Sequence, residues 1–333
     1  MNKGILTYFF ILLLAAGVSF SVQAQSNLSD VQRGVAEFSD GLAKALPFSS
    51  SLGLNWSDAY IGKFFPSAPP HFGVGVAVGA TSLETDSLRN LASQMGAVIF
   101  GNSRWIPIPA YTLEGRMGGF FLPFDVGIKF GYLPTLRYQE IDLDYMLVGG
   151  DVRYAVLDGK RNPLVPNVSV GLGLNYISGG VRTNVGLSQS IRIGIFNFHF
   201  SNSDVSFKWD SLSLDFKVQI SKSLLFLTPY VGLGGSYAWS KAGYLIETGV
   251  TVNGQAITQN HIDAINAELD KLNLERIDIS AQGFSSIVRR NDINLRAFGG
   301  LSFNLMVLKL DLTGLYSFLD NNFGASLGFR FQI

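Results

Sequence analysis

The sequence contains no cysteine, few charged residues and, beyond its first twenty residues, no long apolar run. Without cysteine there are no disulfides, no thiolate metal sites and no lipidated cysteine. Charged residues make up 15% of the chain, against about 25% in soluble domains. The formal net charge of +0 gives nucleic acid no electrostatic attraction. After Phe20 no run approaches the roughly 20 apolar residues that a membrane helix needs. The 47% of hydrophobic residues must therefore be distributed in another way.

The N-terminus carries the features of a secretory signal. A short charged start, Met1-Asn2-Lys3, precedes an apolar run from Ile5 to Phe20, and Val22-Gln23-Ala24 is a small-x-small cleavage site. We interpret residues 1–24 as a signal peptide. An uncleaved membrane anchor is the alternative interpretation. Export of a chain without cysteine suits a protein of the bacterial cell envelope.

Apolar residues alternate with small or polar ones in ten segments over residues 71–333. A strand places alternate side chains on opposite faces, and each segment is near the 9–11 residues with which a tilted strand crosses a bilayer. The pattern predicts an all-β fold, a closed antiparallel transmembrane barrel of about ten strands. Twelve strands remain an alternative, because residues 191–200 also alternate and could form either a further strand or a hairpin that extends above the membrane. The ten segments are approximately 71–82, 106–117, 123–133, 146–157, 166–178, 207–220, 229–241, 292–305, 309–318 and 322–333.

The last segment alternates up to the final residue. Its order of polar, glycine, aromatic and hydrophobic positions, formed by Ser326, Gly328, Phe331 and Ile333, resembles the terminal signal of bacterial outer-membrane β-barrels. The resemblance implies a location in the cell outer membrane, with outer-membrane lipid as a partner. It also implies a periplasmic C-terminus and recognition by the outer-membrane assembly machinery. A soluble β-sandwich with aromatic-rich strands is the alternative fold.

A periplasmic C-terminus assigns each turn to one side of the membrane. The turns near 118–122, 158–165, 221–228 and 306–308 then face the periplasm, and all of them are short. Such short turns opposite long external loops are typical of transmembrane barrels. We expect external loops near 83–105, 134–145, 179–206 and 242–291, with a helix that begins near Asn260 in the longest of them.

Residues 25–70 do not alternate and predict an N-terminal helical plug or cap. Ser29-Asp30-Val31-Gln32 is a capping box, apolar residues recur at helical spacing over 29–46, and Pro47 is expected to end this helix. The segment is too apolar for a solvated tail. We expect it to fold up from the periplasm and to pack against a wall of small residues. This wall comprises Gly73, Gly75, Gly79, Gly324, Ser326 and Gly328.

Two other positions for residues 25–70 remain open: a cap below the barrel and an amphipathic helix on the membrane surface. An apolar N-terminal plug is similar to that of the long-chain fatty-acid transporters of the outer membrane. The likeness concerns the architecture only, and no residue of this chain is matched to a residue of that family. It implies transport of a hydrophobic ligand as an alternative function.

Inward positions of the predicted barrel carry charges of both signs. Several of them form pairs of opposite sign two residues apart on one strand, and two further cations lie on the late strands. Rings of charge are typical of selective pores, so we predict that these side chains line a lumen. The alternative is a network of paired charges that fills a narrow barrel. The predicted lumen-lining residues are Glu114, Arg116, Asp151, Arg153, Asp215, Lys217, Arg296 and Arg330.

The sequence favours a small channel for small solutes, with gating left open. A hydrophobic-ligand transporter is one alternative. The other is a non-conducting barrel that binds surfaces through its external segments 179–206 and 242–291. The three histidines are too scattered for a metal site. His199-Phe200-Ser201 is similar to the His-x-Ser of lipid A deacylases, but no acid is identified that orients the histidine. We therefore expect no enzymatic activity, no metal and no cofactor.

Overall fold

The computed structural model describes residues 24–61, 71–84, 86, 104–119, 123–138, 141–159, 165–184, 189–193, 196–252, 254–256, 258–271, 278–280 and 283–333. The expected signal peptide falls outside these residues except for Ala24. Within the described residues, no helix is long and apolar enough to span a membrane.

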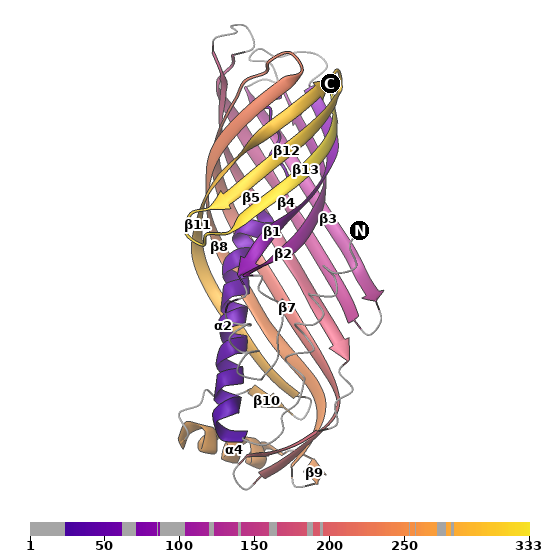
Figure 1. Cartoon of the computed structure of the whole chain (residues 1–333), viewed down its shortest axis with the longest axis vertical. Helices are drawn as coiled ribbons and strands as arrows, with labels where there is room; N and C mark the ends of the chain where they lie inside the picture. The colour runs from indigo at the N-terminus through magenta and orange to yellow at the C-terminus, as the bar shows by residue number, and fades with distance from the viewer. Residues whose placement is uncertain are drawn as a thin grey trace.

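Ten antiparallel strands form a closed barrel (Figure 1). Each barrel strand pairs with the next barrel strand in the sequence, and at two places short additional strands lie between the two partners in the sequence. The last strand pairs with the first. At this seam Gly73 lies opposite Gln332, and Phe72 and Ile333 exchange two backbone hydrogen bonds of 3.2 and 2.9 Å. The prediction of a ten-stranded barrel is confirmed. The strands are β1 (His71–Glu84), β2 (Trp105–Gly118), β3 (Phe124–Tyr138), β4 (Ile141–Leu157), β5 (Asn167–Asn184), β7 (Phe196–Ser221), β8 (Leu227–Val252), β11 (Gly283–Leu305), β12 (Leu308–Ser317) and β13 (Phe323–Gln332).

Three short strands lie beyond the barrel wall. β6 (Gln189–Ile193) pairs only with the start of β7, β9 (Gln255–Ala256) pairs with the end of β8, and β10 (Asp278–Ser280) pairs with the start of β11. The alternating residues 191–200 therefore form a hairpin that extends one side of the barrel. The twelve-stranded alternative is not what the chain forms.

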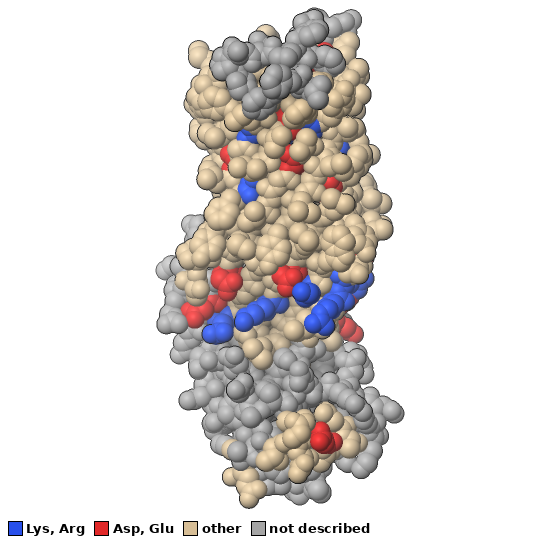
Figure 2. All heavy atoms as spheres, turned by 180° about the vertical axis from the view of Figure 1, so that it is seen from behind, with Lys and Arg blue, Asp and Glu red and all other residues tan. Residues whose placement is uncertain are grey.

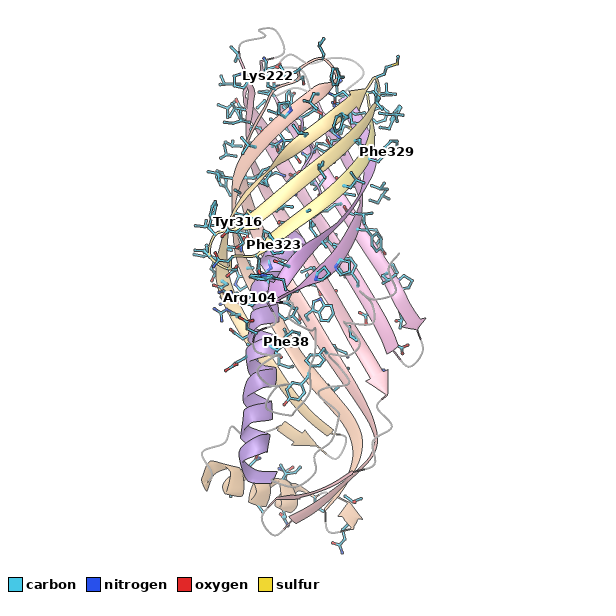
Figure 3. All side chains as sticks on the ribbon, viewed as in Figure 1. Phe38, Arg104, Lys222, Tyr316, Phe323 and Phe329 are labelled. Atoms are coloured by element: carbon cyan, nitrogen blue, oxygen red, sulfur yellow. The ribbon has the colours of Figure 1, made fainter. Side chains whose placement is uncertain are left out.

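The outer surface of the wall is apolar. Val78, Ile128 and Leu233 are 63%, 67% and 60% exposed, whereas the residues on either side of Ile128 and Leu233 are buried and those beside Val78 are half-buried. Tyr316, Phe323 and Phe329 likewise project outward (Figure 3). A soluble protein rarely exposes apolar patches beyond a few hundred Å², so this surface is one that faces hydrocarbon. These side chains are not interleaved between two stacked sheets, which excludes the β-sandwich.

The barrel wall is much taller on one side than on the other. β7 and β8 have 26 residues each, more than twice the 9–11 that a bilayer requires, whereas β12 and β13 have 10 each. The long strands all extend away from the end that holds the C-terminus (Figure 1). Because short turns face the periplasm in such barrels, we call the end with the C-terminus the periplasmic end and the opposite one the outer end.

Three of the expected external loops are largely strand. In segment 134–145, β3 and β4 stay paired out to Tyr138 and Ile141. In 179–206 and 242–291, β5, β7, β8 and β11 continue the sheet beyond the apolar band. The sequence did not reveal these extensions, because outside the bilayer a strand needs no apolar side and the two-residue alternation fades.

Among the described residues, the helices α2 (Ala24–Ser50) and α4 (Gln259–Lys271) lie inside and beyond the barrel wall, respectively. α2 is longer than the expected 29–46, and Pro47 lies inside its last turn. The turn persists because Ser50 Oγ donates a hydrogen bond of 2.8 Å to the Pro47 carbonyl, and Ser49 Oγ donates one of 3.1 Å to Ala45. α4 lies in the longest external segment, as expected, and begins one residue before Asn260.

Candidate functional site in the barrel lumen

The N-terminal segment fills the lumen. We call residues 36–61, the last part of α2 and the coil that follows, the plug; from Phe38 onward almost every side chain in it is buried. α2 enters from the outer end, where it contacts β6, and the coil continues toward the periplasmic end (Figure 1). The expectation that the segment folds up from the periplasm is therefore wrong in direction. Gly53 and Leu54, at φ 81° and 57°, turn the chain where the helix ends.

The outer half of the lumen is apolar. Phe38, Leu42, Leu46 and Phe48 of the plug belong to one buried cluster with inward side chains of the wall. Phe38 packs edge-to-face against Phe207 of β7 with ring centroids 5.8 Å apart. Ion pairs bound this layer at the rim, where Arg290 contacts Asp40 at 2.6 Å and Lys44 contacts Asp320 at 2.9 Å. This part of the plug is held mainly by burial of apolar surface.

The inner half of the lumen is charged, and most of its charges form ion pairs between strands. Arg116 contacts both Asp125, at 2.5 Å, and Asp151, at 2.6 Å. Arg153 contacts the other oxygen of Asp125 at 2.8 Å, and Lys217 pairs with Asp151. These five side chains, from β2, β3, β4 and β7, are all buried. Each charge therefore has a partner of opposite sign, as burial demands.

A second charged cluster joins the plug to the last two strands. Asp58 of the plug contacts Lys309 of β12 at 2.7 Å and Arg330 of β13 at 3.0 Å. Arg330 also contacts Asp311 at 2.6 Å. Asp58 is thus the plug carboxylate shared by two wall cations.

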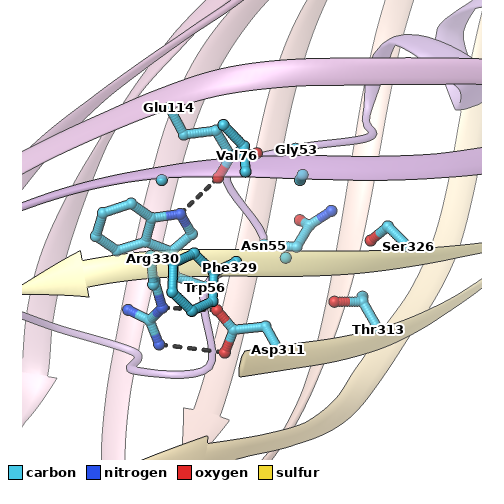
Figure 4. A pocket seen from close by; sticks show the side chains of 13 residues that line it. Gly53, Asn55, Trp56, Val76, Glu114, Asp311, Thr313, Ser326, Phe329 and Arg330 are labelled. Carbon is cyan, nitrogen blue, oxygen red and sulfur yellow. Dashed lines mark hydrogen bonds and ion pairs between the residues drawn. The ribbon is translucent and has the colours of Figure 1, made fainter. Parts of the chain in front are cut away.

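Trp56 occupies a socket between the two clusters (Figure 4). Its indole nitrogen donates a hydrogen bond of 2.5 Å to Glu114. The guanidinium carbons of Arg330 and Arg116 lie 4.6 and 5.7 Å from the ring centroid, within the range of cation–π attraction. Gly73 forms the floor of the socket, because a Cβ there would come within 2.8 Å of the ring.

Wall side chains also hold the plug backbone. Lys129 donates hydrogen bonds of 2.6 Å to the carbonyls of Ser50 and Leu52. Gln219 donates to the carbonyls of Trp56 and Ser57 at 2.7 and 3.1 Å. The coil forms no regular structure of its own, so these donors satisfy carbonyls that would otherwise be buried without a partner.

Little free space remains beside the plug. A cavity bordered by Trp56, Thr313 and Arg330 (Figure 4) has room for about one water molecule, which needs roughly 10–15 Å³. A second cavity, beside Lys129 and Asp151, has no more room than the first. In this conformation the described lumen is closed to solutes.

The structure places all eight residues predicted to line the lumen at inward, buried positions. Seven of them form the ion pairs above or the pair Arg296–Asp215 at 2.7 Å, and Glu114 accepts from Trp56. They form a network around a plug and not a ring around water. Of the small-residue wall, Gly73 contacts the plug directly. A Cβ added at Gly79 or Gly324 would instead meet atoms of the neighbouring strands. Of the predicted assembly signal, Ser326 and Gly328 face the lumen, and Phe331 and Ile333 close the seam with β1.

The sequence analysis missed Trp56, Asp58, Asp125, Lys129 and Gln219. Asp125 and Lys129 occupy inward positions of β3 four residues apart, so the same alternation predicts that both face the lumen. They were not identified because the predicted charge pairs are two residues apart on one strand. Trp56 and Asp58 stand out as a polar interruption in an apolar segment. Which wall residues they meet follows only from the fold.

No protein-family model matches the sequence, and no curated protein matches it. Solved structures with a related fold are distant. The outer membrane protease OmpT from Escherichia coli has 10% identity and a TM-score of 0.38, covering 80% of this chain and 98% of that chain. The translocator domain of the autotransporter NalP from Neisseria meningitidis has 8% identity and a TM-score of 0.37, and the match covers 93% of this chain and 99% of that chain. A Pseudomonas aeruginosa FadL homologue has 14% identity and a TM-score of 0.35, and the match covers 79% of this chain and 67% of that chain.

The comparisons correct one expectation. We expected no enzymatic activity, but the similar structures include a protease, OmpT, together with LpxR from Salmonella typhimurium. The fold therefore does not exclude an enzyme, and the expectation was wrong as a conclusion from the sequence. The side chains of His199 and Ser201 lie outside those that the structure describes. This chain shares with these structures only the β-barrel fold, and it is itself a closed ten-stranded antiparallel barrel.

Proposed function

We propose that the protein is a gated outer-membrane channel for small solutes, held closed by its N-terminal plug. The observation that supports this is the composition of the lumen wall beside the plug. Its inner half is lined by buried ion pairs contributed by β2, β3, β4, β7, β12 and β13.

A permanently filled barrel gains nothing from such a wall. Buried ion pairs are at best about as stabilising as well-packed apolar residues of the same volume, and apolar residues already fill the outer half. A charged wall differs in one respect: it remains hydrated and open when its occupant leaves, whereas an apolar wall dewets. The wall is therefore suited to a lumen that is emptied during function.

The plug also sets the size of the passage. A helix with its side chains is about 10–12 Å across, and α2 lies inside the wall with most of its residues from Phe38 to Ser50 buried. Withdrawal of a helix leaves a passage wide enough for a small hydrated solute. A ten-stranded barrel without an occupant of this kind would be filled largely by its own side chains.

A disulfide across the plug tests the proposal, because the chain has no cysteine of its own. The hydroxyls of Ser50 in the plug and Ser213 in β7 are 3.0 Å apart. We expect wild-type protein in planar bilayers to open intermittently under voltage. The variant S50C/S213C should be silent when oxidised and should open again after reduction.

The matched control is S211C/S240C, which joins two strands of the wall where the hydroxyls are 2.8 Å apart. This bond joins two wall strands to each other and not to the plug, so openings should persist when it is oxidised. Heat-modifiable mobility on a denaturing gel confirms folding of each variant. Openings that survive the oxidised S50C/S213C bond, or a silent wild type whose silence also persists when residues 36–61 are deleted, would contradict the channel.

A second function is favoured by the outer extension of the sheet. β7 and β8 continue well beyond the apolar band and lead into β9 and α4, which suits a barrel that binds a neighbouring surface. This function requires no conductance, and removal of α4 should abolish binding to cells while leaving the barrel folded. The apolar outer half of the lumen is the feature that would serve a hydrophobic ligand, and co-purified lipid inside the barrel would identify that use.

A further inference from the structure

The continuous apolar band ends near the same level on two adjacent strands of the tall side, at Trp239 of β8 and one outward pair earlier, at Ile293, on β11; beyond it, the exposed Ile287 is again apolar. Outward side chains on β8 run Val231, Leu233, Tyr237 and Trp239, and the next outward residue is Lys241. On β11 the outward residue level with Lys241 is Arg289, because the two are directly paired in the sheet. Figure 2 shows a belt of charged side chains below a largely uncharged band.

Lys241 and Arg289 are two like charges in directly opposed positions. Both are exposed, and opposed residues have Cβ atoms about 4.5–5.5 Å apart. Like charges in this arrangement are destabilising. One carboxylate, Asp210 of β7, lies 3.9 Å from Lys241, and among the described residues no carboxylate pairs with Arg289. The pair therefore keeps a net positive charge.

An aromatic pair fixes the depth of these cations in the membrane. Trp239 and Tyr237 pack edge-to-face with centroids 4.9 Å apart, and both are partly exposed on the outer surface. Aromatic side chains of this kind mark the boundary between hydrocarbon and headgroups. Lys241 lies two residues further toward the outer end, about 7 Å along the strand, which is the level of lipid phosphates.

We propose that Lys241 and Arg289 bind a phosphate of an outer-leaflet glycolipid, with Trp239 against the lipid beneath it. A phosphate between the two cations accepts charge-assisted hydrogen bonds from both and removes their mutual repulsion. Membrane surfaces attract basic side chains in the same way. The proposal depends on the orientation of the barrel and not on the channel.

The test uses the full chain refolded in detergent and labelled lipopolysaccharide as the probe. Each cation near an anionic lipid surface contributes roughly fivefold in affinity, so K241Q/R289Q should weaken binding by roughly 30-fold. The matched control is R104Q: Arg104 is an exposed cation at the outer end of the wall, but it already contacts Glu84 at 2.9 Å and Asp86 at 3.2 Å. Its loss should leave binding unchanged.

A variant with the opposite effect separates recognition from misfolding. Asp210→Asn removes the carboxylate beside Lys241 and should strengthen binding about fivefold. Lipopolysaccharide stripped of its lipid A phosphates should bind as weakly as the double variant does. Equal binding by the double variant, equal binding of the dephosphorylated lipid, or full competition by millimolar inorganic phosphate would each overturn the proposal.

Discussion

The indole ring of Trp56 in the plug lies over the guanidinium group of Arg330 in the last strand, with 4.6 Å between the guanidinium carbon and the ring centroid. This contact joins the N-terminal segment to the strand that closes the barrel. We expect Trp56→Ala to weaken seating of the plug by about 3–5 kcal/mol, the range for loss of a buried Trp. Channel openings in planar bilayers should become much more frequent.

The control for this variant is Trp56→Phe. It keeps a ring against Arg330 but removes the N–H that Glu114 accepts, so its openings should be intermediate in frequency. Equal opening frequencies for wild type, Trp56→Phe and Trp56→Ala would show that this contact does not hold the plug.

Gly73 is required because Trp56 packs on it. A Cβ at Gly73 would lie 2.8 Å from the ring and 3.0 Å from the Phe331 carbonyl, so Gly73→Ala should cost about 1–3 kcal/mol, as overpacking does. The ring has to move, and we expect faster protease cleavage within residues 36–61 of the folded protein. Gly115→Ala is the control, since its Cβ would meet only Ile128 at 3.7 Å. An identical cleavage rate for the two variants would contradict the packing argument.

Asp58 is a buried carboxylate that pairs with the half-buried Lys309 and with the buried Arg330. Asp58→Asn leaves Lys309 without its 2.7 Å partner and should lower the free energy of unfolding by about 3–5 kcal/mol, the range for breaking a buried pair. Asp86→Asn breaks only a solvent-exposed contact to Arg104 and should change stability by less than about 1 kcal/mol. Urea unfolding in lipid vesicles measures both. Similar midpoints for the two variants would count against a buried network.

The wall left by a withdrawn plug has an excess of cations. Its inner half holds seven cations, six of them buried and Lys309 half-buried, and five buried carboxylates, so the open channel should prefer anions. Reversal potentials under a salt gradient measure this preference. In K129Q/K217Q the preference should disappear, because the charges then balance; a cation preference in the wild type would refute this reading. The cations are Arg116, Lys129, Arg153, Lys217, Arg296, Lys309 and Arg330, and the carboxylates are Glu114, Asp125, Asp151, Asp215 and Asp311.

The sequence predicts the membrane part of the barrel well, because the bilayer imposes one simple rule on it. Every residue of a spanning strand faces either hydrocarbon or the lumen, so a two-residue pattern such as that of β12 identifies the strand and the side of each residue. Beyond the bilayer the rule no longer applies. The outer part of β8 was accordingly expected to be a loop, and that of β7 was left open because residues 191–200 alternate. The two strands remain paired from Phe198 to Trp209, apart from a register shift between Ser201 and Asp204.

The plug shows a different limit of sequence-based prediction. Its apolar side chains indicate that it must be buried, but they do not indicate from which end it enters. Entry from the outer end depends on the tall side of the wall, against which α2 packs along β7, β8 and β11. Pro47 was expected to end the helix, and local hydrogen bonds from Ser49 and Ser50 override that preference.

The barrel closes where β1 pairs with β13, and the N-terminal part of the same chain lies inside it. The strand that follows the plug in the sequence, β1, is one side of this seam, and β13 is the other. The plug is therefore tethered through the chain to the seam, so any movement of residues 36–61 out of the lumen is limited by their attachment to β1.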